Sequence, residues 1–169
     1  MDILLASDHA GFELKEKIRA YLKSEKHNVV DYGPHEYDEN DDYPDYVAPL
    51  AQEISQNTRS MGIIIGGSGQ GEAMVANRFP RVRAIVYNGE TRPSDGRKVP
   101  DELLLSREHN DANVLSLGAR FLSEEEAKSA VTKWLGGKFS SHERHIRRIK
   151  KMDSLPPCNI PDDSDILGV

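Results

Sequence analysis

Residues 61–77 read MGIIIGGSGQGEAMVAN, the most informative segment of the chain for its fold. Its apolar start is typical of a buried β-strand, residues 66–71 form a glycine-rich loop, and the segment that follows has the pattern of a helix. Backbone N–H groups of such a loop can converge on an anion, and the positive end of the helix dipole strengthens the attraction. Glu72 would add a carboxylate beside that anion site. An anion site next to a base is the minimum equipment for removing a proton from a carbon adjacent to a carbonyl.

The glycine loop does not match two common nucleotide-binding motifs. If the G-x-G-x-x-G template starts at Gly67 or Gly69, Glu72 or Met74 stands where the last glycine should be. A P-loop is excluded because no Gly-Lys-Ser/Thr follows. A tight turn without a ligand is the alternative, but so many glycines cost backbone entropy without a structural need. Glu72 could also serve the helix dipole alone, because carboxylates are favoured in a first helical turn.

Short apolar runs alternate with helical patterns along the whole chain. We expect strands at residues 3–6, 28–32, 63–65, 82–86 and 113–117, with helices around 14–22, 44–56 and 124–135. This alternation predicts a single doubly wound, Rossmann-like α/β domain with a five-stranded parallel sheet. A C-terminal helix completes the domain, which we expect to cover residues 1–153. Residues 154–169 form an acidic, proline-containing tail.

The composition is that of an ordinary globular protein, and it excludes several classes of function. The chain has 169 residues, 37% of them hydrophobic, which is enough for one domain with a real core. A net charge of -6 argues against a nucleic-acid partner. No stretch is apolar enough to span a membrane, and the first residues lack the basic region of a signal peptide. The single cysteine, Cys158, excludes an internal disulfide, so a cytoplasmic location is expected.

Two polar clusters lie next to predicted strands. Residues 7–11, SDHAG, follow the first strand. Ligands of parallel sheets bind at the carboxyl ends of the strands, so Asp8 and His9 are candidate substrate contacts, although Asp8 could be a plain helix cap. His109 precedes the fifth strand and would therefore lie at the opposite edge. From one chain alone, a surface histidine capped by Asp111 is the favoured interpretation, unless a neighbouring subunit brings His109 to the glycine loop.

A basic cluster, HERHIRR at residues 142–148, lies in the predicted last helix. Arg144 and Arg148 are four positions apart and share a helix face. Arg binds phosphate oxygens in a bidentate manner, so the cluster suits a phosphate group. Salt bridges to the acidic loops are the alternative. His142 and His145 do not have zinc-ligand spacing, and no metal is expected.

Taken together, these motifs resemble the ribose-5-phosphate isomerase B family, which includes the galactose-6-phosphate isomerase subunits. The resemblance is carried, in family order, by SDHAGF at 7–12, DYP at 42–44, GGSGQG at 66–71, AN at 76–77, HNDANV at 109–114, LGAR at 117–120 and RH at 144–145. It implies interconversion of ribose 5-phosphate and ribulose 5-phosphate by proton transfer through a cis-enediolate. No cofactor and no metal are implied.

The resemblance also implies residue roles. Many members carry a cysteine base where this chain has Gly66, but a second branch has Gly-Gly-Ser-Gly-x-Gly-Glu with the glutamate as base, which matches Glu72. His109 matches the acid/base that opens the sugar ring. The loop that would hold the enediolate oxygen includes Gly67, Ser68, Gly69 and Gly71. Sugar contacts are implied for Asp8, Tyr43 and Asn110, and phosphate contacts for His9, Arg120, Arg144 and Arg148.

Members of the family are dimers, often paired into tetramers, with sites at the subunit interface, which would bring His109 from a partner chain. This chain departs from the pattern at residues 88–102, a glycine- and proline-containing surface loop longer than its family counterpart, and around residues 139–144. Such changes leave open an isomerase of allose 6-, galactose 6- or erythrulose 4-phosphate. A sugar-phosphate-binding subunit without catalysis is a further alternative, and a nucleotide-binding module a more distant one.

Overall fold

The computed structural model describes residues 2–57, 59–90 and 93–155. Most of the predicted tail, residues 156–169, lies outside this part of the chain. The strands are β1 (Asp2–Ser7), β2 (Asn28–Asp31), β3 (Met61–Gly66), β4 (Ala84–Tyr87) and β5 (Val114–Gly118). The helices are α1 (Phe12–Ser24), α2 (Tyr43–Gln56), α3 (Gln70–Ala76), α4 (Glu102–Asn110), α5 (Glu124–Gly136) and α6 (Glu143–Asp153). None of the helices in the described residues is long and apolar enough to cross a membrane.

The strands form one parallel sheet in the order β2-β1-β3-β5-β4, which confirms the predicted fold class. β1 lies between β2 and β3. The chain therefore passes from β1 to β2 on one side, and then from β2 back across β1 to β3 on the other side. The loops that follow β1 and β3 therefore meet at a topological switch point, where open α/β sheets bind ligands. Residues 7–11 and 66–72 are these two loops.

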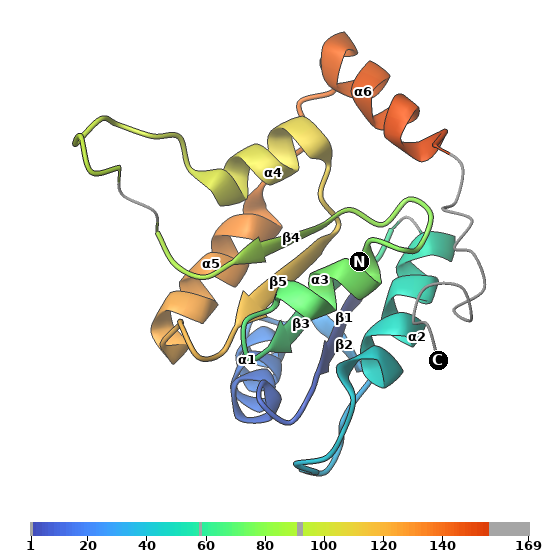
Figure 1. Ribbon diagram of the computed structural model, residues 1–169, viewed down its shortest axis with the longest axis vertical. Helices are drawn as coiled ribbons and strands as arrows, with labels where there is room; N and C mark the ends of the chain where they lie inside the picture. The colour runs from blue at the N-terminus through green and yellow to red at the C-terminus, as the bar shows by residue number, and fades with distance from the viewer. Residues whose placement is uncertain (1, 58, 91–92, 156–169) are drawn as a thin grey trace, which may run out of the picture.

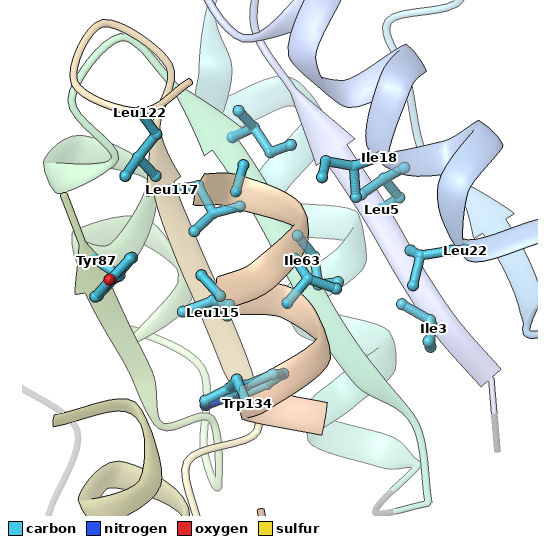
Figure 2. Close-up of a cluster of buried hydrophobic side chains, with 14 of the residues drawn as sticks. Ile3, Leu5, Ile18, Leu22, Ile63, Tyr87, Leu115, Leu117, Leu122 and Trp134 are labelled. Carbon is cyan, nitrogen blue, oxygen red and sulfur yellow. The ribbon is translucent and has the colours of Figure 1, made fainter. Parts of the chain in front are cut away.

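Helices cover both faces of the sheet, and each face has its own core. Helices α1 and α5 pack against one face, where Ile63, Leu115 and the fully buried Trp134 lie in one cluster of side chains (Figure 2). Helices α2 and α3 cover the other face, which takes alternate strand residues such as Ile64. A strand buried on both faces is apolar at every position, which explains the uninterrupted run in β3.

The last helix, α6, lies beside α4 and apart from the sheet (Figure 1). Only one residue of α6, His145, is buried within the described part of the chain. Its other side chains carry charge or are partly exposed, so most of this helix is not used by the core of its own chain.

One strand begins later than predicted. We expected the fourth strand to start at residue 82, but β4 starts at Ala84. The N–H of Val82 closes a turn onto the carbonyl of Phe79, and the N–H of Arg83 donates to the side chain of Asn113 at 2.7 Å. These donors are therefore not available to the strand ladder, because a side chain and a turn compete for them.

Candidate active site

The glycine loop joins the end of β3 to α3 and is held by its carbonyl groups. Gly69 has φ = 74°, a left-handed conformation that favours glycine, and its carbonyl accepts a hydrogen bond from Ser116 Oγ at 2.6 Å. The carbonyl of Ser68 accepts from Asn88 Nδ2 at 3.1 Å. Within the described residues, the N–H groups of Gly67, Ser68 and Gly69 have no acceptor. Carbonyls turned inward and free N–H groups are what an anion-binding loop requires.

The Glu72 side chain folds back over the loop and is only 4% exposed. A Cβ atom at position 66 would lie 1.7 Å from its Oε1, so the carboxyl group occupies the space that any larger residue than Gly66 would need. Burial raises the pKa of Glu72, its own backbone N–H lowers it, and the charge of Asp8 raises it further. A buried carboxyl group with a raised pKa beside an anion loop is equipped for proton transfer.

Asp8 and Tyr43 both lie near Glu72: the charge of Asp8 acts on its carboxyl group, and Tyr43 lies against the neighbouring Gly71. Asp8 is buried at the end of β1, and its Oδ1 accepts from the N–H of Gly11 at 2.9 Å, so it also caps the turn into α1. Tyr43 opens α2 and lies against the first turn of α3, since a Cβ atom at Gly71 would be 2.8 Å from its hydroxyl oxygen. Both predicted sugar contacts are thus at the ligand edge of the sheet.

His9 is oriented by a carboxylate that sequence reasoning missed. Oδ1 of Asp41 lies 2.7 Å from Nδ1 of His9 and accepts from the His9 backbone N–H at 2.9 Å. The pKa of His9 is raised, chiefly by this hydrogen bond, with the charges of Asp8 and Asp41 adding to it and burial opposing it. His9 therefore stays positively charged to a higher pH than a free histidine, which suits an anionic ligand.

Arg120 is the one predicted phosphate-binding arginine that its own chain brings to the glycine loop. It follows β5, and a Cβ atom at Gly67 would lie 3.1 Å from its guanidinium carbon. Asn88, which sequence reasoning also missed, holds the loop from the end of β4. Asn88 comes directly after β4, and this position at the carboxyl end of a strand could have marked it as a site residue.

The remaining predicted residues lie at the opposite edge. His109 and Asn110 end α4, which leads into the amino end of β5, whereas the glycine loop follows the carboxyl end of β3. A five-residue strand spans about 15 Å, so one chain cannot bring His109 to Glu72 without unfolding. The interpretation of His109 as capped by Asp111 is wrong, because the Asp111 carboxylate accepts hydrogen bonds from Arg83 and Arg107 instead.

His109 belongs to a histidine cluster between α4 and α6. Its ring lies 4.3 Å from that of His145, measured between centroids. His145 is buried, with Nδ1 2.8 Å from Ser140 Oγ and Nε2 accepting from Arg144 Nε at 3.0 Å. Burial lowers the pKa of His145, and His109 and Arg144 lower it further. The neutral ring of His145 thus orients Arg144, while Arg148 is exposed one turn further along α6.

The matching family model and the similar relatives all indicate the same family. A family model described as Ribose/Galactose Isomerase matches residues 3–152. Ribose-5-phosphate isomerase B of Mycolicibacterium paratuberculosis is 38% identical over 150 residues, which cover 88% of this chain and 87% of that protein. Probable ribose-5-phosphate isomerase B of Mycoplasma pneumoniae is 40% identical over 151 residues, which cover 89% and 91%.

Solved structures agree with the sequence comparison. Ribose-5-phosphate isomerase B of Mycoplasma genitalium, with bound ribulose-5-phosphate, superimposes with a TM-score of 0.80 at 38% identity and covers 90% of this chain and 93% of that one. The Thermotoga maritima ribose 5-phosphate isomerase gives a TM-score of 0.78 at 38% identity, with 91% and 98% covered. The predicted resemblance is confirmed, and the chain belongs to the ribose/galactose isomerase family.

Proposed function

We propose that this protein interconverts ribose 5-phosphate and ribulose 5-phosphate, with Glu72 as the base. The observation that carries the proposal is the Glu72 carboxyl group, buried in the space left by Gly66 and next to a loop with free N–H groups. The names of the relatives, and the ribulose-5-phosphate bound in one of them, support the choice of substrate.

In the proposed reaction, Glu72 removes the proton from C2 of the open-chain aldose. The electron pair moves into the C1–C2 bond, and the negative charge develops on O1 of a cis-enediolate. N–H groups of Gly67, Ser68, Gly69 and Gly71 stabilise that oxygen. The C2 hydroxyl then loses its proton while O1 gains one, and Glu72 returns its proton to C1, which gives the ketose. Its raised pKa brings Glu72 closer to the working pH, where a general base is most effective.

Asp8 and Tyr43 would hold sugar hydroxyl groups near Glu72, while His9 and Arg120 would face the phosphate. We further propose that a partner chain supplies His109 for ring opening, Asn110 for a sugar contact, and Arg144 and Arg148 for the phosphate. This sharing is supported by the position of these four residues at the sheet edge opposite the glycine loop. It is also supported by α6, which contacts its own chain mainly through α4. The assembly would be a homodimer, or a tetramer made of two such dimers.

A coupled assay that detects ribulose 5-phosphate formed from ribose 5-phosphate tests the activity directly. Allose 6-, galactose 6- and erythrulose 4-phosphate belong in the same panel, because the segment at residues 88–102 could alter the sugar pocket. We expect the highest kcat/KM with ribose 5-phosphate. Thermal stabilisation by ribose 5-phosphate without turnover would indicate a binding subunit and refute the proposal.

Replacement of Gly66 by alanine should disable the site. The added methyl carbon would coincide with the Glu72 carboxyl group, which must then leave its position. We expect kcat to fall by roughly a hundredfold, as for other displaced general bases. Steady-state kinetics measure the effect. Gly136→Ala is the matched control, since a Cβ atom there meets no atom within 4 Å, and it should keep full activity. Full activity of Gly66→Ala would contradict the assigned position of the base.

Replacement of Asp41 by asparagine should make substrate binding more sensitive to pH. Asp41 raises the pKa of His9, so its loss lowers that pKa, and His9 loses its proton at a lower pH. KM should therefore rise several-fold between pH 6 and pH 8 in the variant, and less in the wild type, with kcat nearly unchanged. Glu39→Gln, an exposed change in the same loop, is the control. Parallel KM profiles in variant and wild type would show that Asp41 does not act through the His9 charge.

A further inference from the structure

A basic cavity lies at the amino edge of the sheet, away from the glycine loop of the same chain. Its volume is about 360 Å³, in the range of small-molecule sites. Four arginines from three segments converge on it. Arg59 follows α2, Arg81 and Arg83 precede β4, and Arg107 belongs to the last turn of α4. Two aspartates complete the charged lining, Asp111 after α4 and Asp153 at the end of α6.

The negative charges of the two aspartates do not neutralise the positive charges of the four arginines. Asp111 is shared between Arg83 Nη2 at 3.1 Å and Arg107 Nη1 at 3.2 Å, while Asp153 is 3.8 Å from Arg83. Arg81 donates to a neutral backbone carbonyl, that of Ser55. With four arginines and two aspartates, the lining has an excess of two positive charges.

Arg59 has capacity left for a ligand, whereas Arg107 already donates to Asp111 and to the carbonyl of Ala112. Arg59 is exposed and makes no ion pair with any described residue. Nε of Arg107 is buried and has no hydrogen-bond partner within the described part of the chain. Burial lowers the pKa of Arg107, Asp111 opposes that shift, and the charge of Arg83 adds to it. An anion in the cavity would relieve the repulsion between Arg83 and Arg107.

We propose that this cavity binds the phosphate group of a small phosphorylated metabolite, at a site separate from the glycine loop. A phosphate monoester carries close to two negative charges at neutral pH, which matches the excess in the lining. Its three terminal oxygens can accept bidentate hydrogen bonds from guanidinium groups. The site joins the turn after α2 to the ends of α4 and α6, so a bound phosphate would link three segments of the chain.

Inorganic phosphate is the probe, and isothermal titration calorimetry is the measurement. His9→Ala removes one phosphate contact proposed for the glycine-loop site, but Arg120, Arg144 and Arg148 remain there. Phosphate binding is therefore assigned to the cavity only where it depends on Arg59. Titrations are run against sodium chloride of the same ionic strength, because screening then affects all samples equally. Arg59→Glu reverses the charge at the cavity, and Lys23→Glu, an exposed change in α1, is the control for the same reversal of charge elsewhere.

We expect His9→Ala to bind phosphate saturably. The double variant His9→Ala/Arg59→Glu should bind it at least tenfold more weakly, because an attractive contact becomes a repulsive one. Adding Lys23→Glu instead should change the Kd by less than about twofold, since Lys23 is exposed and does not line the cavity. Absence of saturable binding in His9→Ala, or an equal Kd with and without Arg59→Glu, would overturn the proposal.

Discussion

Glu72→Gln should lower kcat by about a thousandfold, within the range that general bases contribute. Glutamine has nearly the same shape as glutamate and fits the same space over Gly66, but its amide cannot accept the proton from C2. The free N–H groups of the loop, His9 and Arg120 are unchanged, so ribose 5-phosphate should still bind. Steady-state kinetics give kcat, and calorimetric titration with ribose 5-phosphate gives the binding constant.

The control for this variant is Glu13→Gln. Glu13 also stands in a first helical turn, that of α1, but it is exposed. If Glu72 served only the helix dipole, the two variants would lose similar stability and neither would lose activity. The pH profile adds a second criterion. Because burial raises the pKa of Glu72, activity should be lost on acidification at a higher pH than an ordinary glutamate would give. Unchanged turnover in Glu72→Gln would eliminate Glu72 as the base.

The structure explains why one chain cannot use both types of base known in the family. A cysteine at position 66 would need a Cβ atom where the Glu72 carboxyl group now lies, 1.7 Å from Oε1. The two side chains therefore compete for the same space. The sequence alone indicated that a cysteine was absent and a glutamate present, but the exclusion of one by the other depends on how the loop folds back onto itself.

Local patterns were enough to predict most of the fold. The run at residues 61–65 was assigned correctly because a strand covered on both faces needs apolar side chains at every position. The end of α5 was similarly marked by two glycines. The start of β4 has no such local mark. It depends on the hydrogen bond from the N–H of Arg83 to the side chain of Asn113, which is 30 positions away in the sequence. Bonds between distant segments leave no local pattern to read.

Among the site residues too, those in a local motif could be predicted, and those that depend on distant segments could not. Glu72 could be singled out because it lies in the same motif as the glycines. Asp41 could not, because it is one of several acidic residues in its loop and its partner His9 is 32 positions away. Even with the family resemblance, His109 could be assigned only through a partner chain. The fold supports that expectation, since α4 ends at one edge of the sheet and the glycine loop lies at the other.

Mixing two inactive variants should restore activity if the site is shared. In Glu72→Gln each chain lacks the base, and in His109→Ala each chain lacks the ring-opening group. A dimer with one chain of each kind has one site with both defects and one site with neither. Purified mixed dimers should therefore show about half the activity of the wild type, although both parents are nearly inactive. Heterodimers are isolated by co-expression with two different affinity tags, and turnover of ribose 5-phosphate is measured.

The control combines both changes in one chain. A mixed dimer of Glu72→Gln/His109→Ala with the wild type has one defect in each site, because every site takes its Glu72 and its His109 from different chains. It should be nearly inactive, even though half of its chains are intact. If each chain formed its own site, the results would be reversed, because the wild-type chain would stay active and the two single variants could not complement each other. The two mixed dimers thus contain the same number of substitutions, and only a site formed by two chains makes the first active and the second inactive.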